Sequence, residues 1–109
     1  MNTPAETLAR LAIQTLDRQQ CYFRGRQTAV LDECKVLESQ LRAAAAALPG
    51  DDLAGLTLRT LDAQRRFFAG DRSRDTVALC RGLERRLRVA ATHVLNPVNV
   101  QPSLFEVGA

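Results

Sequence analysis

The sequence predicts an all-α protein: a four-helix bundle or array of two tandem helical hairpins with pseudo-twofold symmetry, followed by an extended C-terminal tail. Two observations support this fold class. Leucine and alanine, both good helix formers, dominate the 109 residues, whereas aromatic residues make up 5% and tryptophan is absent. In addition, an internal repeat covers most of the chain. We therefore expect one domain with an aliphatic core.

The repeat has a period of about 45 residues. Residues 8–25 recur as residues 53–70, with the same spacing of Leu-Ala, Thr-Leu-Asp and Gln, and with two adjacent aromatic residues before a glycine. After one inserted residue, residues 34–45 recur as residues 80–91, and both segments begin with cysteine. Each copy predicts a helix, a tight connection and a second helix, and short connections predict antiparallel neighbours.

Capping residues predict where the helices begin and end. We expect the first, second and fourth helices at about 4–24, 28–48 and 73–95, and a third that starts after Asp51 or Asp52. Thr3 is the expected N-cap of the first helix, whereas Gly25 and Gly70 are expected in left-handed C-caps. The resulting division is a duplicated helical-hairpin domain at 1–96, with repeats at about 4–48 and 51–95, and a tail at 97–109.

The first helix has one broad apolar face. Its members are Leu8, Leu11, Ala12, Thr15, Leu16, Tyr22 and Phe23. Gln19 lies at the centre of this face, and Gln64 has the same place in the second copy. Because a buried amide must find hydrogen-bond partners, we expect the two side chains to meet near the pseudo-twofold axis and fix the register. A ligand pocket is the alternative.

Ile13 and Leu58 fall outside this face, towards the expected solvent side. Their repetition suggests a second contact surface for a homodimer or a protein partner, with simple tolerance of exposed aliphatic residues as the alternative.

Four carboxylates recur symmetrically, but ion pairs explain them better than a metal. The expected pairs, four residues apart, are Asp62–Arg66, Glu38–Arg42 and Glu84–Arg88. Di-iron bundles use Glu-x-x-His pairs, and this chain has one histidine. We therefore expect no metal and no cofactor.

Positive charge is concentrated in the second copy, although the net charge is only +3. Arg74, Arg81, Arg85 and Arg88 share one face of the fourth predicted helix and are candidate contacts for nucleic acid. A solvated charged face is the alternative, and the absence of interleaved aromatic residues argues against base stacking.

The three cysteines, Cys21, Cys34 and Cys80, show no CxxC spacing. Residues 1–10 lack a signal-peptide pattern, and no run of about 20 apolar residues could span a membrane. We expect reduced thiols in a cytoplasmic protein, with Cys34 and Cys80 buried on apolar faces and Cys21 exposed.

Two resemblances concern the helical body. The run from Phe68 to Asp71, followed by Ala78 and Leu83, resembles a tetratricopeptide helix, although the period of that family is about 34 residues. The spacing of Arg88 and His93 is similar to the Arg-x4-His motif of HEPN ribonucleases, which implies that paired helices bring both side chains to the scissile phosphate. Val89 departs from the polar residue usual after that arginine. A histidine placed by the helix dipole in the last turn is the alternative.

The tail carries the sharpest motif in the sequence. Gln101-Pro102-Ser103-Leu104-Phe105 resembles the bacterial sliding-clamp-binding peptide, roughly Gln-Leu-Ser/Asp-Leu-Phe. The resemblance implies that Leu104 and Phe105 enter an apolar pocket of the clamp while Gln101 hydrogen-bonds at its mouth. The alternative is that Leu104 and Phe105 cover the core of the protein itself or of a dimer mate.

The leading functional hypothesis is a non-enzymatic interaction module of bacterial DNA replication that binds the sliding clamp through Gln101, Ser103, Leu104 and Phe105. One rival is a self-associating structural bundle with an unknown partner. The other is an HEPN-like ribonuclease that uses Arg88 and His93.

Overall fold

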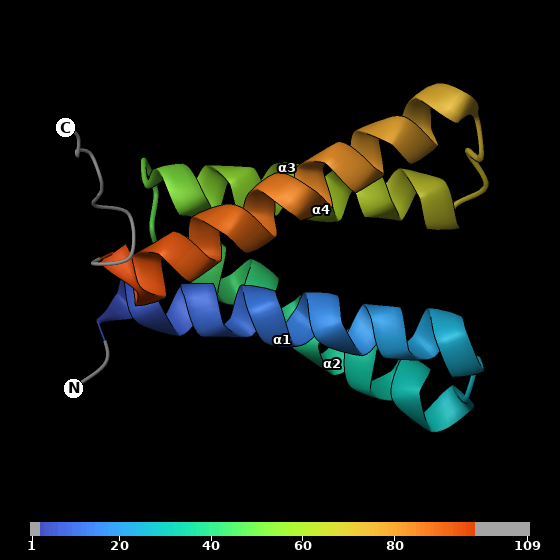
Figure 1. Cartoon of the computed structure of the whole chain (residues 1–109), viewed down its shortest axis with the longest axis horizontal. Coiled ribbons are helices and arrows are strands. Elements are labelled where there is room, and N and C mark those ends of the chain that lie inside the picture. The colour runs from blue at the N-terminus through green and yellow to red at the C-terminus, as the bar shows by residue number, and fades with distance from the viewer. Residues whose placement is uncertain (1–2, 98–109) are drawn as a thin grey trace, which may run out of the picture.

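The structure, a computed structural model, describes residues 3–97, and these form four α-helices with no strand (Figure 1). The helices are α1 (Pro4–Gly25), α2 (Thr28–Ala46), α3 (Asp52–Phe68) and α4 (Arg74–Leu95). The predicted all-α fold of two helical hairpins is confirmed. The expected tail lies outside the described residues, apart from Pro97.

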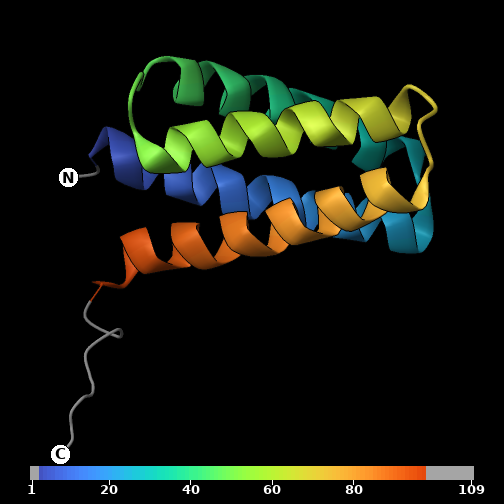
Figure 2. The ribbon, with the colours of Figure 1, turned by 90° about the horizontal axis from the view of Figure 1, so that it is seen from above.

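The four helices form an antiparallel bundle in which each hairpin packs against the other. Helix α1 packs on α2 and α4, α3 packs on α2 and α4, and α1 also contacts α3 across the centre. The α1–α2 and α3–α4 turns lie at one end of the bundle, whereas the α2–α3 connection lies at the other (Figures 1 and 2). A pseudo-twofold relation exchanges α1 with α3 and α2 with α4, so equivalent residues of the repeat meet near the centre.

Side chains cap the starts of α1, α3 and α4, whereas Gln27, the N-cap of α2, makes no such bond. Thr3 and Glu6 form a reciprocal capping box, in which the Thr3 hydroxyl accepts from the Glu6 N–H at 3.1 Å. The Asp51 carboxylate accepts from the N–H of Ala54 at 2.9 Å, which identifies Asp51 rather than Asp52 as the N-cap of α3. Ser73 is the N-cap of α4.

The ends of α1 and α3 differ, although the sequence predicts the same glycine cap for both. Gly70 has a φ of +120°, and the N–H of Gly70 and that of the next residue close the last turn onto carbonyls of α3. The prediction for Gly25 is wrong, because Gly25 is the last residue of α1 and Arg26 takes the left-handed conformation at φ 56°. The Arg26 guanidinium lies 5.3 Å from the Phe23 ring centroid, a contact that offsets part of the conformational cost. Helix α2 also ends earlier than expected, at Ala46.

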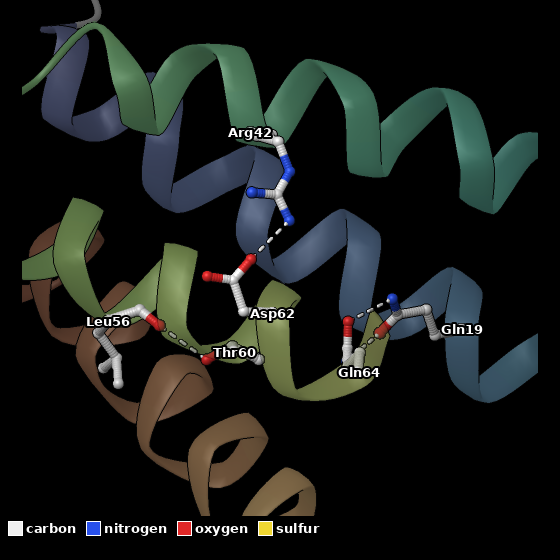
Figure 3. A network of polar contacts seen from close by, with 6 residues as sticks. All are labelled: Gln19, Arg42, Leu56, Thr60, Asp62 and Gln64. Atoms are coloured by element: carbon white, nitrogen blue, oxygen red, sulfur yellow. Dashed lines mark hydrogen bonds and ion pairs between the residues drawn. The ribbon is translucent and has the colours of Figure 1, made fainter. Parts of the chain in front are cut away.

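The core is aliphatic and lies between the two hairpins. Leu8, Leu41 and Leu87 are almost completely buried, and alanines at facing positions allow the helices to approach closely. Three buried threonines, Thr15, Thr57 and Thr60, donate their hydroxyls to backbone carbonyls one turn earlier, at 2.7–2.8 Å. Figure 3 shows the Thr60 bond to the Leu56 carbonyl.

Two predictions about the helix faces are wrong. Ile13 and Leu58, expected towards the solvent side, are half-buried and pack against the core. Conversely, Phe23 is 40% exposed although it was expected on the buried face, and its equivalent Phe68 is 48% exposed. Both lie near the turn end of the bundle, where the helix ends give them fewer neighbours to pack against.

Candidate functional site

The amide side chains of Gln19 and Gln64 meet at the centre of the bundle (Figure 3). The Nε2 of Gln19 donates to the Oε1 of Gln64 at 3.0 Å, and the Nε2 of Gln64 donates back to the Oε1 of Gln19 at 2.9 Å. Both side chains are 6% exposed. The prediction that the two side chains meet near the pseudo-twofold axis is therefore confirmed.

Each glutamine also donates to a carboxylate of its own hairpin. Gln19 donates to Oε2 of Glu38, and Gln64 donates to Oε2 of Glu84, both at 2.7 Å. Both amide donors of each glutamine are thus used, and a charged acceptor strengthens one bond of each. The result is a continuous polar chain from Glu38 through the two glutamines to Glu84, which links α2, α1, α3 and α4.

The ion pairs differ from those predicted within single helices. Arg42 of α2 pairs with Asp62 of α3 at 3.2 Å (Figure 3), and Arg88 of α4 pairs with Asp17 of α1 at 2.8 Å. These are pseudo-equivalent pairs that join the two hairpins. The single-helix prediction is wrong because Glu38 and Glu84 accept hydrogen bonds from the glutamines, while each arginine reaches across to the other hairpin.

Two small pockets flank the glutamine pair and are related by the pseudo-twofold axis. One has a volume of about 380 Å³ and the other about 250 Å³, and both reach Gln19, Phe23 and Phe68. The first is lined on the α2 side by Leu31, Cys34, Lys35 and Glu38, and the second on the α4 side by Val77, Cys80, Arg81 and Glu84. Each pocket therefore combines a thiol, a carboxylate and a cation.

The thiols in these pockets are poor nucleophiles. Burial raises the pKa of Cys34 and of Cys80, and the nearby carboxylates of Glu38 and Glu84 raise it further. A raised pKa lowers the fraction of reactive thiolate at neutral pH. The predicted burial of these two cysteines and the predicted exposure of Cys21 are confirmed.

The arginine stripe of α4 lines a groove between α1 and α4. This groove has a volume of about 340 Å³, and Arg81, Arg85 and Arg88 lie along it, with Gln20 and Phe23 on the α1 side. Arg74, at the start of α4, is not among the lining residues. Three of the four arginines predicted to share a face therefore lie in one concave surface.

The structure does not bring Arg88 and His93 together. Arg88 lines the α1/α4 groove, whereas His93 lines an apolar groove of about 640 Å³ between α3 and α4, with Leu56 and Val89. An HEPN-type site would therefore require a second copy of the chain. Among residues 3–97, no group of three or more His, Cys, Asp or Glu side chains could hold a metal ion.

The clamp-binding residues Gln101, Ser103, Leu104 and Phe105 lie outside the described part of the chain. Within the described part, no helix combines the length and the apolar character that crossing a membrane requires.

Sequence reasoning missed the contact between Phe23 and Phe68. Their rings stack with centroids 5.9 Å apart and planes 4° from parallel. The signal was present, because the two residues are equivalent in the repeat and follow the paired glutamines by four positions, about one helical turn.

Comparisons of the chain with protein-family models, with curated proteins and with solved structures found no match.

Proposed function

We propose that this protein is a non-catalytic interaction module that binds a bacterial sliding clamp through its C-terminal peptide. The observation that carries the proposal is the peptide itself, Gln101 to Phe105, which begins shortly after α4 ends at Leu95. A few apolar anchors with one orienting polar group are sufficient for such docking.

The helical body supports a binding role rather than a catalytic one. The polar side chains at its centre bond to one another in the chain Glu38–Gln19–Gln64–Glu84, so their donors are engaged in holding the hairpins together. The two buried thiols have raised pKa values, which disfavours nucleophilic chemistry there. In this proposal the bundle is a rigid carrier for the docking peptide.

Fluorescence anisotropy with the labelled full-length protein and a purified bacterial sliding clamp tests the proposal. We expect a Kd in the micromolar range or tighter, and loss of binding in Leu104→Ala/Phe105→Ala. The matched control, Val98→Ala/Val100→Ala, removes apolar groups of the same segment outside the motif and should bind as the original protein does. Absence of binding, or equal binding by both double variants, would refute the proposal.

A second candidate function is self-association through the apolar groove between α3 and α4. Val89 on this groove is 65% exposed, and Leu53, Leu56 and Val94 line it. An apolar groove with an exposed valine at its edge can take up an apolar side chain of a second copy. We expect Val89→Lys to convert a dimer to a monomer in sedimentation equilibrium, whereas Val36→Lys, at a 56% exposed valine of α2, should leave the dimer intact. A monomeric original protein would exclude this function.

A further inference from the structure

The α1/α4 groove has an excess of positive charge, because its one carboxylate, Glu84, offsets only part of the charge of Arg81 and Arg85. Arg88 is paired with Asp17, and Glu84 in the same groove accepts a hydrogen bond from Gln64. Arg81 and Arg85 take part in none of the ion pairs found among residues 3–97. Because both guanidinium groups are exposed and lie one helical turn apart on α4, they can contact neighbouring phosphates of one strand.

The groove continues into an exposed aromatic surface. Phe23 lines the groove together with Arg81, and the same two residues line the neighbouring pocket with Phe67 and Phe68. The charged and the aromatic parts are therefore one connected surface. In the sequence, no aromatic residue lies between the arginines of α4, which argued against base stacking. Phe23 and Phe68 belong to α1 and α3, and only the fold brings them beside the arginines of α4.

Further arginines at the turn end increase the positive charge around these rings. The guanidinium carbon of Arg72 lies 4.1 Å from the Phe67 ring centroid, and that of Arg26 lies 5.3 Å from the Phe23 ring centroid. Such contacts hold the cations near the aromatic surface.

We propose that this surface binds single-stranded nucleic acid: Arg81 and Arg85 contact backbone phosphates in the groove, and a base packs against the exposed side of the stacked Phe23–Phe68 ring pair. Cationic grooves combined with aromatic platforms bind single strands with little sequence preference. The bases of a duplex are already stacked on each other, so the phenylalanines distinguish a single strand from a duplex. Because the contacts are to phosphates and base faces, DNA and RNA strands should bind about equally.

The first experiment measures anisotropy of labelled thymidine and uridine oligomers of about 15 nucleotides, a length in the range covered by single-strand sites. The double variant Arg81→Gln/Arg85→Gln should weaken binding and make the slope of log K against log salt shallower by about 1.4. Arg59→Gln/Arg86→Gln is the matched control, because it removes the same charge from exposed positions outside the groove and should change affinity little.

The second experiment removes the aromatic platform without removing charge. Phe23→Leu/Phe68→Leu should weaken single-strand binding about tenfold or more while the salt slope stays the same. Unchanged far-ultraviolet circular dichroism and a cooperative thermal transition establish that the variant is folded. Leu104→Ala/Phe105→Ala should bind oligonucleotides normally, so failure of clamp docking and failure of this inference are distinguishable.

Four outcomes overturn the inference. A duplex of equal length could bind as tightly as the single strand, or the control arginine variant could lose as much affinity as the groove variant. The phenylalanine variant could bind like the original protein, or an oligoglutamate of equal charge could compete as well as the oligonucleotide, which would make an acidic peptide the better ligand.

Discussion

Replacing Gln19 with leucine removes the central link of the polar chain that joins the two hairpins. The substitution deletes the charge-assisted bond to Glu38 and both bonds to Gln64. Gln64 keeps its bond to Glu84, but its carbonyl and one amide hydrogen then lack their partner in a site that is 6% exposed. The substitution therefore lowers stability through lost hydrogen bonds between helices and not through a change in helix propensity.

The magnitude follows from these bonds. A hydrogen bond to a charged group contributes about 1.5–3 kcal/mol and a neutral one about 1 kcal/mol. Glu38 is only partly buried and can regain water, while burial of the leucine contributes about 1.5–3 kcal/mol in the opposite direction. We expect the free energy of unfolding to fall by about 1–3 kcal/mol, a sizeable part of the stability of a small domain.

Urea unfolding followed by circular dichroism measures this loss in a double-mutant cycle. Gln19→Leu and Gln64→Leu should each be destabilising, and the double variant should cost about 2 kcal/mol less than their sum, because either substitution alone already removes the two bonds between the glutamines. Gln20→Leu makes the same change at the neighbouring exposed position and should shift stability by about 0.5 kcal/mol or less.

Two results would refute the reasoning. Strict additivity in the cycle would mean that the glutamines do not depend on each other. A loss in Gln19→Leu no larger than that in Gln20→Leu would mean that the buried polar chain does not stabilise the bundle.

Three further predictions concern the thiols, a turn and an acid. Ellman's reagent should modify Cys21 rapidly and the two buried cysteines only on unfolding, and a fast phase that persists in Cys21→Ser would contradict this. Gly70→Ala should destabilise by about 1–3 kcal/mol because of its φ of +120°, whereas Gly82→Ala, with open space around it inside α4, should stabilise by about 0.5–1 kcal/mol, both measured by urea unfolding. The Thr76 hydroxyl lowers the pKa of Asp71 below its ordinary 3.8, so this acid stabilises the fold above that value and the contribution is lost as pH falls through the folded pKa. In Thr76→Val the Asp71 pKa should rise in an NMR titration, and an unchanged value would exclude the hydroxyl as its cause.

The sequence by itself determined the fold class, because the repeat and the helical periodicity depend only on local spacing. The starts of α1 and α3 were also predictable, since the caps Thr3 and Asp51 act through hydrogen bonds to residues three positions away. The burial of Gln19 and Gln64 followed from their place on apolar faces, and symmetry suggested that they would meet.

Only the tertiary structure decided with which residues the charged side chains pair and which aromatic rings remain exposed. Arg42 and Arg88 had acidic neighbours one turn away in their own helices but pair across the hairpin boundary, because the crossing of the helices brings Asp62 and Asp17 within reach. The same crossing places Phe23 beside the arginines of α4. Contacts between residues far apart in the chain depend on how the helices cross, which local periodicity does not encode.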